Sequence, residues 1–388
     1  MGVISAIGNS VAENRMALVN GTCGIHNELD LFPTKFAGIL PFGQVKTSTG
    51  NFLKDLHITE PGVTRTTMLA LHAFEEVIQD GSLSAAQLSS ADTALIGAST
   101  VGGMCLTDEL YADANKTGGG SAYTASYDSA SVTMYLQERF KMNGIINTIN
   151  TACSSSANAI MFGAMLIKNG FAKRAIVGGA DSLAKYTING FHALHILSPE
   201  KCTPFDENRK GLNLGEGAAF LLLEKEEDMA GKKVYAELTG YCNANDAYHP
   251  SSLSDNADGP FFSMQGALRS AKLSEREISF INAHGTGTEN NDEAESKALI
   301  RLFQSPPPLA SNKGNIGHTL GAAGAIEAVY SVLSLVNQEV YANLHFEKPI
   351  ASTGLVPVGA YRKMPLQHIM SNSFGFGGNC SSLIFSKA

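Results

Sequence analysis

The segment Thr151-Ala152-Cys153-Ser154-Ser155-Ser156 places a cysteine where an apolar segment gives way to a run of small residues. Residues 144–150, before it, are typical of a strand, and in residues 156–168, after it, apolar side chains recur at helical spacing. Cys153 is therefore expected at a corner between a strand and a helix. Unpartnered N–H groups and the helix dipole favour a thiolate there, so the sequence predicts a thiol pKa below about 8.5 and a nucleophilic role. The alternative is a buried structural cysteine.

The chain of 388 residues is long for one hydrophobic core, which favours two similar halves. We expect these halves at 1–230 and 231–388, because the charge-dense segment 224–233 separates two regions that each alternate apolar strands with helices. An exposed turn is the alternative interpretation of the charged segment.

Apolar patterns in both halves alternate between strand and helix periodicity. The expected strands are 94–97, 144–150, 175–180, 218–223, 234–241, 278–281, 368–371 and 382–385, and the expected helices are 66–79, 129–140, 156–168, 264–271 and 292–303. Three consecutive glycines at 118–120 predict a flexible loop. This alternation predicts an α/β fold with mainly parallel sheets covered by helices on both faces.

A weak internal repeat relates residues 150–159 to residues 315–325. In each segment a chemically reactive residue, Cys153 or His318, precedes a helix made of small residues. Such a helix can be buried on all sides, because Ala, Gly and Ser let other backbone approach closely. If the two halves pack about a pseudo-twofold axis, both helix starts point into one pocket and bring Cys153 near His318.

The composition argues against several classes of partner. The chain carries 28 basic and 36 acidic residues, a formal charge of −8, which does not favour nucleic acid or an anionic membrane surface. Its six cysteines form no CxxC pair, which is typical of reduced thiols in a cytoplasm. A run of eighteen apolar residues and an export leader are both absent, so a soluble, cytoplasmic protein is expected.

Two histidines lie directly after apolar segments in settings rich in Gly and Thr. His284 precedes Gly285-Thr286-Gly287-Thr288, and His318 follows Asn315-Ile316-Gly317. Either histidine alone is more often structural, but together with a corner cysteine they favour a catalytic group. Zinc-site spacing is absent, so no metal is expected. Neither GxxxxGK[ST] nor an early GxGxxG occurs, so nucleotide binding is not expected.

Four segments in this order resemble the successive motifs of the β-ketoacyl-acyl carrier protein synthases of the elongating type I/II kind. They are Thr151–Ser156, Asn-Ala-His-Gly-Thr-Gly-Thr at 282–288, Ser-Asn-Lys-Gly-Asn-Ile-Gly-His at 311–318, and Asn-Ser-Phe-Gly-Phe-Gly-Gly at 372–378. The segments 206–211, 215–218 and 320–327 also resemble that family. The resemblance runs in unbroken order from the first residues of the chain to the last.

The resemblance implies a five-layered, thiolase-like fold of two pseudo-twofold-related βαβαβαββ halves. It implies a decarboxylative Claisen condensation of an enzyme-bound acyl chain with malonyl-acyl carrier protein, giving a 3-oxoacyl-acyl carrier protein in fatty acid or related chain elongation. Two alternatives stay open: a condensing enzyme of a specialised polyene or polyketide-like pathway with a dedicated carrier protein, and a non-catalytic chain-length partner of the same fold. Intact Cys153, His284 and His318 argue against the last.

The resemblance also assigns roles to single residues. Cys153 would carry the acyl group, and His284 and His318 would stabilise the enolate. The backbone N–H groups of Cys153 and Phe376 would form the oxyanion hole. The remaining implied residues are Lys313, as a further catalytic residue in a charged network with Glu327 and Asp292; Thr286 and Thr288, as phosphopantetheine contacts; and Phe374, Phe376 and Phe191, around the acyl pocket. Pocket depth is expected to depend on Gly102, Met104, Phe191 and a partner subunit.

The implied partners are an acyl carrier protein and a second copy of the chain in a homodimer. A cofactor is not required, because the substrates are carried on the phosphopantetheine of the carrier protein. No nucleic acid and no membrane is implied.

The sequence departs from the family in three places. Met1–Gly8 is expected to be the end of a strand and its turn, without the opening strand that the family has inside its first sheet. Gly377-Gly378-Asn379-Cys380 stands where the family has Gly-Gly-Thr-Asn. The basic cluster that contacts the carrier protein is reduced to Arg65, which favours a specialised carrier unless Lys201, Arg209 or Lys210 rebuild the cluster.

Overall fold

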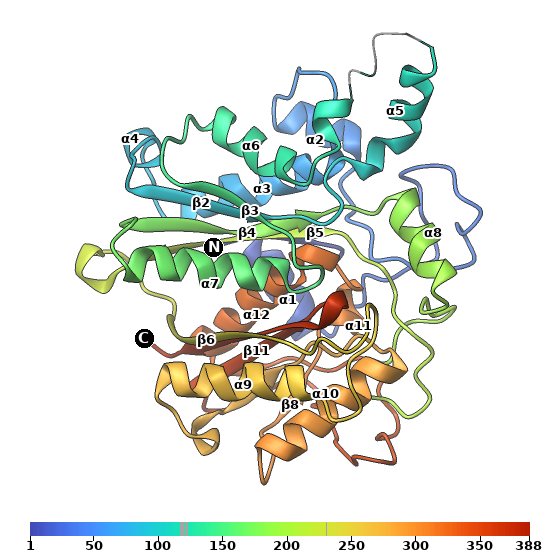
Figure 1. The fold of residues 1–388 in the computed structure, drawn as a ribbon, viewed down its shortest axis with the longest axis vertical. Coiled ribbons are helices and arrows are strands. Elements are labelled where there is room, and N and C mark those ends of the chain that lie inside the picture. Colours follow the sequence, from blue (N-terminus) through green and yellow to red (C-terminus); the bar gives the residue numbers. More distant parts are fainter. Residues whose placement is uncertain (117–120, 122, 230) are drawn as a thin grey trace.

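Two five-stranded sheets lie between layers of helices (Figure 1). This computed structural model describes residues 1–116, 121, 123–229 and 231–388, and the loop predicted from the glycines at 118–120 lies outside the described residues. The first sheet has the order β1 (Gly2–Ser5), β5 (Gly217–Glu224), β4 (Arg174–Asp181), β2 (Thr93–Ala98) and β3 (Ile146–Ile149). The second sheet has the order β6 (Glu237–Asn245), β12 (Asn379–Ser386), β11 (His368–Phe374), β7 (Phe280–Asn282) and β8 (Leu309–Ala310).

The two sheets repeat the same pairing pattern. In each order, the first two strand pairs are antiparallel and the last two are parallel. The chain order agrees as well, since the first strand of each half lies at one end of its sheet beside the last strand of that half. The predicted arrangement of two repeated α/β halves is confirmed. The prediction of mainly parallel sheets is wrong, because half of the strand pairs in each sheet are antiparallel.

Helices fill a middle layer and two outer layers (Figure 1). The middle layer contains α7 (Ser155–Lys168), packed on β4 and β2, and α12 (Ala323–Asn337), packed on β11. The outer helices are α3 (Arg65–Asp80) and α6 (Ala130–Arg139) on the first sheet and α9 (Asp258–Ala271), with α10 (Glu289–Leu302) beside it, on the second. The other elements are α1 (Val11–Val19), α2 (Thr49–Asp55), α4 (Ala85–Leu88), α5 (Thr107–Ala114), α8 (Lys185–Ala193), α11 (Lys313–Ile316), β9 (Glu339–Val340) and β10 (Arg362–Lys363).

Small residues allow the two middle helices to approach each other closely. A Cβ atom on Gly324 would lie 2.8 Å from the backbone nitrogen of Ala157 and 2.9 Å from its Cβ, so only glycine fits there. The N–H of Ala325 donates a hydrogen bond to the Ser156 hydroxyl across the contact, at 2.8 Å. The start of α12 is thereby held beside the start of α7, as the internal repeat predicts.

Residues Leu320–Asn337 form a helical stretch that is long and apolar enough to span a membrane. Inside the protein 89% of this stretch is buried, and Glu327 lies in its middle. It is therefore the core helix that separates the two sheets, which explains its apolar composition.

The structure corrects the expected N-terminus and two boundaries. The first strand is present as β1, which pairs antiparallel with β5 at the end of the first sheet and not inside it. α9 begins at Asp258, earlier than the predicted start at residue 264, because Asp258-Gly259-Pro260 hides its first turn from an apolar pattern. β6 begins at Glu237, later than the predicted start at residue 234.

Candidate active site

Cys153 lies at the predicted corner between β3 and α7. The corner turns through Ala152, whose φ of +53° is in the left-handed region that non-glycine residues seldom adopt. The hydroxyl of Ser155 accepts a hydrogen bond from the N–H of Thr151, at 2.9 Å, and donates one to the carbonyl of Ala152, at 2.5 Å. These bonds hold the strained turn, which aims the buried Cys153 side chain into a pocket at the start of α7.

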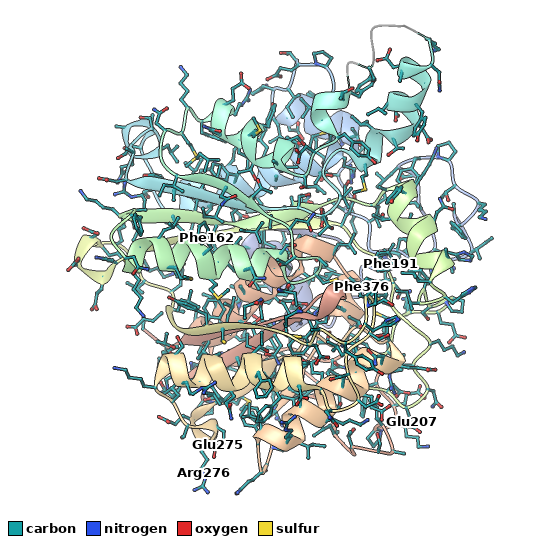
Figure 2. The ribbon with its side chains drawn as sticks, viewed as in Figure 1. Phe162, Phe191, Glu207, Glu275, Arg276 and Phe376 are labelled. Carbon is teal, nitrogen blue, oxygen red and sulfur yellow. The ribbon has the colours of Figure 1, made fainter. Side chains whose placement is uncertain are left out.

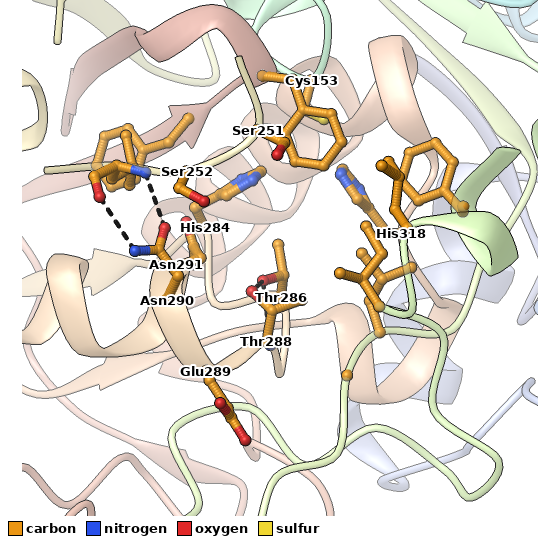
Figure 3. Close-up of a pocket in the computed structure, with 18 of the residues that line it drawn as sticks. Cys153, Ser251, Ser252, His284, Thr286, Thr288, Glu289, Asn290, Asn291 and His318 are labelled. Atoms are coloured by element: carbon orange, nitrogen blue, oxygen red, sulfur yellow. Dashed lines mark hydrogen bonds between the residues drawn. The ribbon is translucent and has the colours of Figure 1, made fainter. Parts of the chain in front are cut away.

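His284 and His318 meet Cys153 in this pocket (Figure 3). His284 follows β7, and His318 lies between α11 and the short turn that begins α12. The thiol and one nitrogen of each imidazole lie within 4.8 Å of one another, and the two ring centroids are 5.4 Å apart. The structure thus brings together three residues from two halves of the chain, including the predicted pair of Cys153 and His318.

Burial shifts the pKa of all three groups. It raises the pKa of the Cys153 thiol to about 11, although the Lys313 ammonium and the N–H groups of Phe376 and Cys153 lower it. The predicted thiol pKa below 8.5 is therefore wrong, because loss of water outweighs the helix terminus. Burial, followed by the charge of Lys313, holds the pKa of both His284 and His318 well below 6.5, so both rings are neutral at pH 7.

Lys313 and Glu327 form an ion pair behind His284. The Lys313 ammonium bonds to Glu327 Oε1 and to the His284 carbonyl, and it lies 3.3 Å from His284 Nδ1. An ammonium can only donate, so Nδ1 of the neutral ring accepts and the ring proton is on Nε2. The pair therefore fixes the tautomer of His284. Burial raises the pKa of Glu327 to about 6, while Lys313 lowers it.

Asp292 is not a member of this network, contrary to expectation. Its carboxylate accepts hydrogen bonds from the N–H groups of Thr286, Gly287 and Phe205, and so shapes the loop after His284. The sequence analysis missed Glu295, one turn further along α10, which accepts from the N–H groups of His284 and Gly285 at 2.9 and 2.8 Å. Burial raises the pKa of Glu295 to about 7. The sequence did hold a sign of this role: Asp292 and Glu295 are two acidic residues three positions apart, just after a Gly-Thr-rich loop.

The pocket has a volume of about 400 Å³, and Cys153 is one of the residues that line it. The residues predicted from the sequence that do line it are Cys153, Phe191, His284, Thr286, Thr288, His318, Phe374 and Phe376. The rings of Phe191 and Phe376 stack with centroids 5.8 Å apart (Figure 2), and the hydroxyls of Thr286 and Thr288 are 2.8 Å apart (Figure 3). Gly102 and Met104, which were expected to set its depth, do not line it.

A loop that the sequence analysis missed forms another wall of the pocket. Ser251, Ser252 and Leu253 line it, and the side chain of Asn290 bonds to both the N–H and the carbonyl of Leu253, at 2.8 and 3.0 Å (Figure 3). The carbonyl of Pro250 accepts from the N–H of Gly377 at 2.7 Å. This loop is polar and lacks periodicity, so the sequence carried no signal for it.

Cys153, His284 and His318 also form a group of residue types that bind metals. The surroundings do not fit a resident ion. A zinc-bound histidine usually donates its second ring N–H to an acceptor, whereas His284 Nδ1 faces the Lys313 ammonium, which would also repel a cation.

Arg65 was expected at the surface as a contact for a carrier protein. It is buried, and its guanidinium pairs with Glu216, with Nη2 2.6 Å from Oε1. Arg209 is also buried and bonds to the carbonyls of Asp206, Thr288 and Glu289. Lys201 and Lys210 remain exposed, and Lys210 pairs with Glu200. Arg65 therefore has a structural role.

The five-layered fold and a pocket lined by a cysteine and two neutral imidazoles define an acyl-transferring enzyme with a thiolase-like fold. The chain belongs to the β-ketoacyl synthase family. Residues 1–229 match the family description "Beta-ketoacyl synthase, N-terminal domain", and residues 235–347 match "Beta-ketoacyl synthase, C-terminal domain". It is accordingly an acyltransferase of the 3-oxoacyl-[acyl-carrier-protein] synthase class, and its reaction is a condensation.

Proteins similar to this one match it along its whole length. The 3-oxoacyl-[acyl-carrier-protein] synthase 2 of Vibrio harveyi and that of Vibrio cholerae are each 31% identical to it, and the matches cover 100% of this chain and 97% of each relative. Among solved structures, the ishigamide ketosynthase/chain length factor has a TM-score of 0.92 at 26% identity and matches 100% of this chain and 97% of that one. A ketosynthase from Xenorhabdus doucetiae, solved in complex with its chain length factor, has a TM-score of 0.87 at 30% identity and matches 100% and 96%.

Proposed function

We propose that Cys153, His284 and His318 catalyse the decarboxylative condensation of an enzyme-bound acyl chain with a malonyl thioester on an acyl carrier protein. The observation that carries this proposal is the grouping of one thiol and two imidazoles within 4.8 Å in the wall of the pocket. The first step exchanges thioesters. The Cys153 sulfur attacks the acyl carbonyl, the bond to the carrier sulfur breaks, and the thiol proton passes to that departing sulfur.

Two backbone donors support the acyl transfer. The N–H groups of Phe376 and Cys153 both lower the pKa of the Cys153 thiol, so both favour negative charge at the sulfur. A carbonyl oxygen that develops negative charge beside this sulfur would accept hydrogen bonds from the same two groups, as an oxyanion hole requires.

The histidines act in the second step. Loss of carbon dioxide from the malonyl group leaves an enolate, and the Nε2–H of His284, with an N–H of His318, donates to its oxygen. The enolate carbon then attacks the acyl carbonyl on Cys153. The carbon–sulfur bond breaks, and Cys153 takes a proton from solvent. The products are carbon dioxide and a 3-oxoacyl thioester.

The residues around the reacting groups position them. Lys313 and Glu327 keep the proton of His284 on Nε2, and Asp292 shapes the loop that carries Thr286 and Thr288. The hydroxyls of those threonines face the pocket, where they suit the amides of a phosphopantetheine arm. Phe191, Phe374 and Phe376 supply the apolar wall for the acyl chain.

The proposed reaction needs neither a metal nor a redox cofactor, because the leaving group is carbon dioxide and the acceptor is a thioester. Activity should therefore persist in excess EDTA. All six cysteines are free thiols, which suits a reducing compartment such as a cytoplasm.

The test uses the intact protein with octanoyl- and malonyl-acyl carrier protein. We expect octanoyl mass on the peptide that contains Cys153 and formation of a 3-oxodecanoyl thioester. Cys153→Ala should abolish both the acylation and the condensation. Cys242 is a half-buried cysteine outside the pocket, and Cys242→Ala should retain both activities. Cys153→Gln should keep malonyl decarboxylation, and His318→Ala should lose decarboxylation more than acyl transfer. Acylation of Cys153→Ala would contradict the proposal.

A specialised pathway with its own carrier protein is the second candidate. Burial of Arg65 removes the basic side chain expected to meet a fatty-acid carrier, and two neighbours described above are named with a chain length factor. The measurement is kcat/KM with the host's fatty-acid carrier protein and with each other carrier protein that it encodes, at two salt concentrations. A strong, salt-sensitive preference for the fatty-acid carrier would exclude this candidate.

A further inference from the structure

Asn379 occupies one of the positions where the sequence departs from the family. It is the first residue of β12 and follows the tight turn Gly375–Gly378 that connects β11 to β12. Its backbone carbonyl accepts from the N–H of Gly375 at 2.7 Å, which closes the turn. Asn379 therefore lies at the base of the segment that presents the Phe376 N–H to Cys153.

The side-chain oxygen of Asn379 accepts three hydrogen bonds from other parts of the chain. Its Oδ1 accepts from the Ser154 hydroxyl at 2.8 Å, from Asn158 Nδ2 at 2.9 Å and from Asn243 Nδ2 at 2.6 Å. Ser154 directly follows Cys153, Asn158 lies in the first turns of α7, and Asn243 lies on β6. One amide oxygen thus ties the turn to the helix that carries the nucleophile.

Little room separates the turn from that helix. A Cβ atom on Gly375 would lie 2.7 Å from the Thr151 carbonyl oxygen and 3.1 Å from the Cys153 nitrogen. Gly377 and Gly378 both adopt positive φ, of +81° and +80°, and of the turn residues Gly375–Gly378 only Phe376 has a side chain. The Phe376 ring, which stacks on Phe191, and the bond from the Gly377 N–H to the Pro250 carbonyl hold the tip of the turn, and contacts at its base hold the rest.

We propose that Asn379 is a positioning residue that sets the distance between the Phe376 N–H and the oxygen of the acyl group on Cys153. This role rests on the proposed function, in which that N–H stabilises the oxyanion of acyl transfer. Asn379 contacts neither histidine, so the decarboxylation step does not depend on it. Loss of the tether should slow acyl transfer by roughly 10- to 100-fold, as displacement of an oxyanion donor does.

The experiment compares Asn379→Ala, Asn379→Thr and Asn379→Asp with Asn143→Ala, an exposed asparagine on the loop before β3. Acyl transfer is measured by intact mass with octanoyl-N-acetylcysteamine, and decarboxylation with malonyl-N-acetylcysteamine in the Cys153→Gln background. We expect slow transfer and unchanged decarboxylation for Asn379→Ala. Asn379→Asp retains the acceptor oxygen and should recover most of the rate, whereas the shorter Thr hydroxyl should recover part of it.

Three results would overturn the role: normal transfer by Asn379→Ala, equal losses of transfer and decarboxylation, or no recovery by Asn379→Asp. If Asn379→Ala fails to fold, the rates of acyl transfer by Asn379→Thr and Asn379→Asp are compared instead. A faster rate for Asn379→Asp supports the role, and equal rates would overturn it. Absence of acyl transfer by the unsubstituted protein would overturn the proposed function and this role together. The three results above concern the Asn379 variants alone, so they would overturn only the role of Asn379.

Discussion

The thiol of Cys153 is subject to two opposing influences. The start of α7, the Lys313 ammonium and two N–H groups favour the thiolate, while burial favours the thiol and prevails. Both nearby histidines are neutral, so a thiolate–imidazolium pair, which activates some cysteine enzymes, does not form. At pH 7 the nucleophile of the free enzyme is therefore the protonated thiol.

This protonation state predicts how Cys153 reacts with iodoacetamide. Because the pKa is raised to about 11, the thiolate fraction should rise roughly tenfold per pH unit between pH 7 and 9, and the alkylation rate with it. The rate is measured by mass spectrometry on the Cys153 peptide, with Cys242 in the same protein as the reference. A plateau at or below pH 8 would show that the helix terminus prevails over burial.

The three reacting residues were predictable because each follows an apolar strand in a distinctive run of small residues. Glu295 was missed although two acidic residues after a Gly-Thr-rich loop pointed to it. Asn379 was not predictable, since it bonds to Ser154 and Asn158 across more than two hundred residues. The pKa of Cys153 was mispredicted for a related reason. The helix start is visible in the sequence, but the burial that opposes it arises only when both halves fold around the pocket.

At the scale of elements, the buried pair of Arg65 and Glu216 connects α3 to β5. Glu216 directly precedes β5 and also accepts from the N–H groups of Val45 and Leu183, so this one carboxylate joins four segments. A basic residue at the start of a helix looks like a surface contact in sequence. Its partner lies in another element, and for this reason its burial was not predictable.

Arg65→Ala should lower the free energy of unfolding by about 3–5 kcal/mol, because it leaves the Glu216 charge buried and unpaired. Lys210→Ala, which breaks the exposed pair with Glu200, should cost less than about 1 kcal/mol. Urea denaturation measures both. Carrier-protein affinity, measured by titration, should change with Lys210 more than with Arg65. A stable Arg65→Ala protein with weakened carrier binding would contradict the structural role.

At the scale of the whole molecule, the first sheet has two edge strands, of which β1 is buried and β3 is partly exposed. β3 pairs only with β2 among the described strands, and apolar side chains lie exposed near it on α7 and on the segment before the strand. These include Met165 and Ile145, and Phe162 projects from the same helix (Figure 2). An open, apolar strand edge is rarely left uncovered, so a second copy of the chain is the expected cover.

Light scattering should therefore give a mass near twice 41.0 kDa for the unsubstituted protein. Met165→Glu should shift the mass towards the monomer, because it places a charge in the apolar contact. Met16→Glu is the matched control, since Met16 is also exposed but lies on α1, which contacts β1 at the opposite end of the sheet. A monomeric unsubstituted protein at micromolar concentration, or equal effects of the two substitutions, would exclude this interface.

The position of β1 has a consequence for synthesis on the ribosome. Gly2 pairs with Phe220, so the first strand leaves the ribosome long before the strand that completes its hydrogen bonds exists. At roughly 5–20 residues per second this delay is on the order of 10–40 s. During it, Val3 and Ile4, which are fully buried in the finished protein, have no native partner on β5. Until β5 is made, the residues of β1 are thus exposed to aggregation, and we expect chaperones that act during translation to bind them.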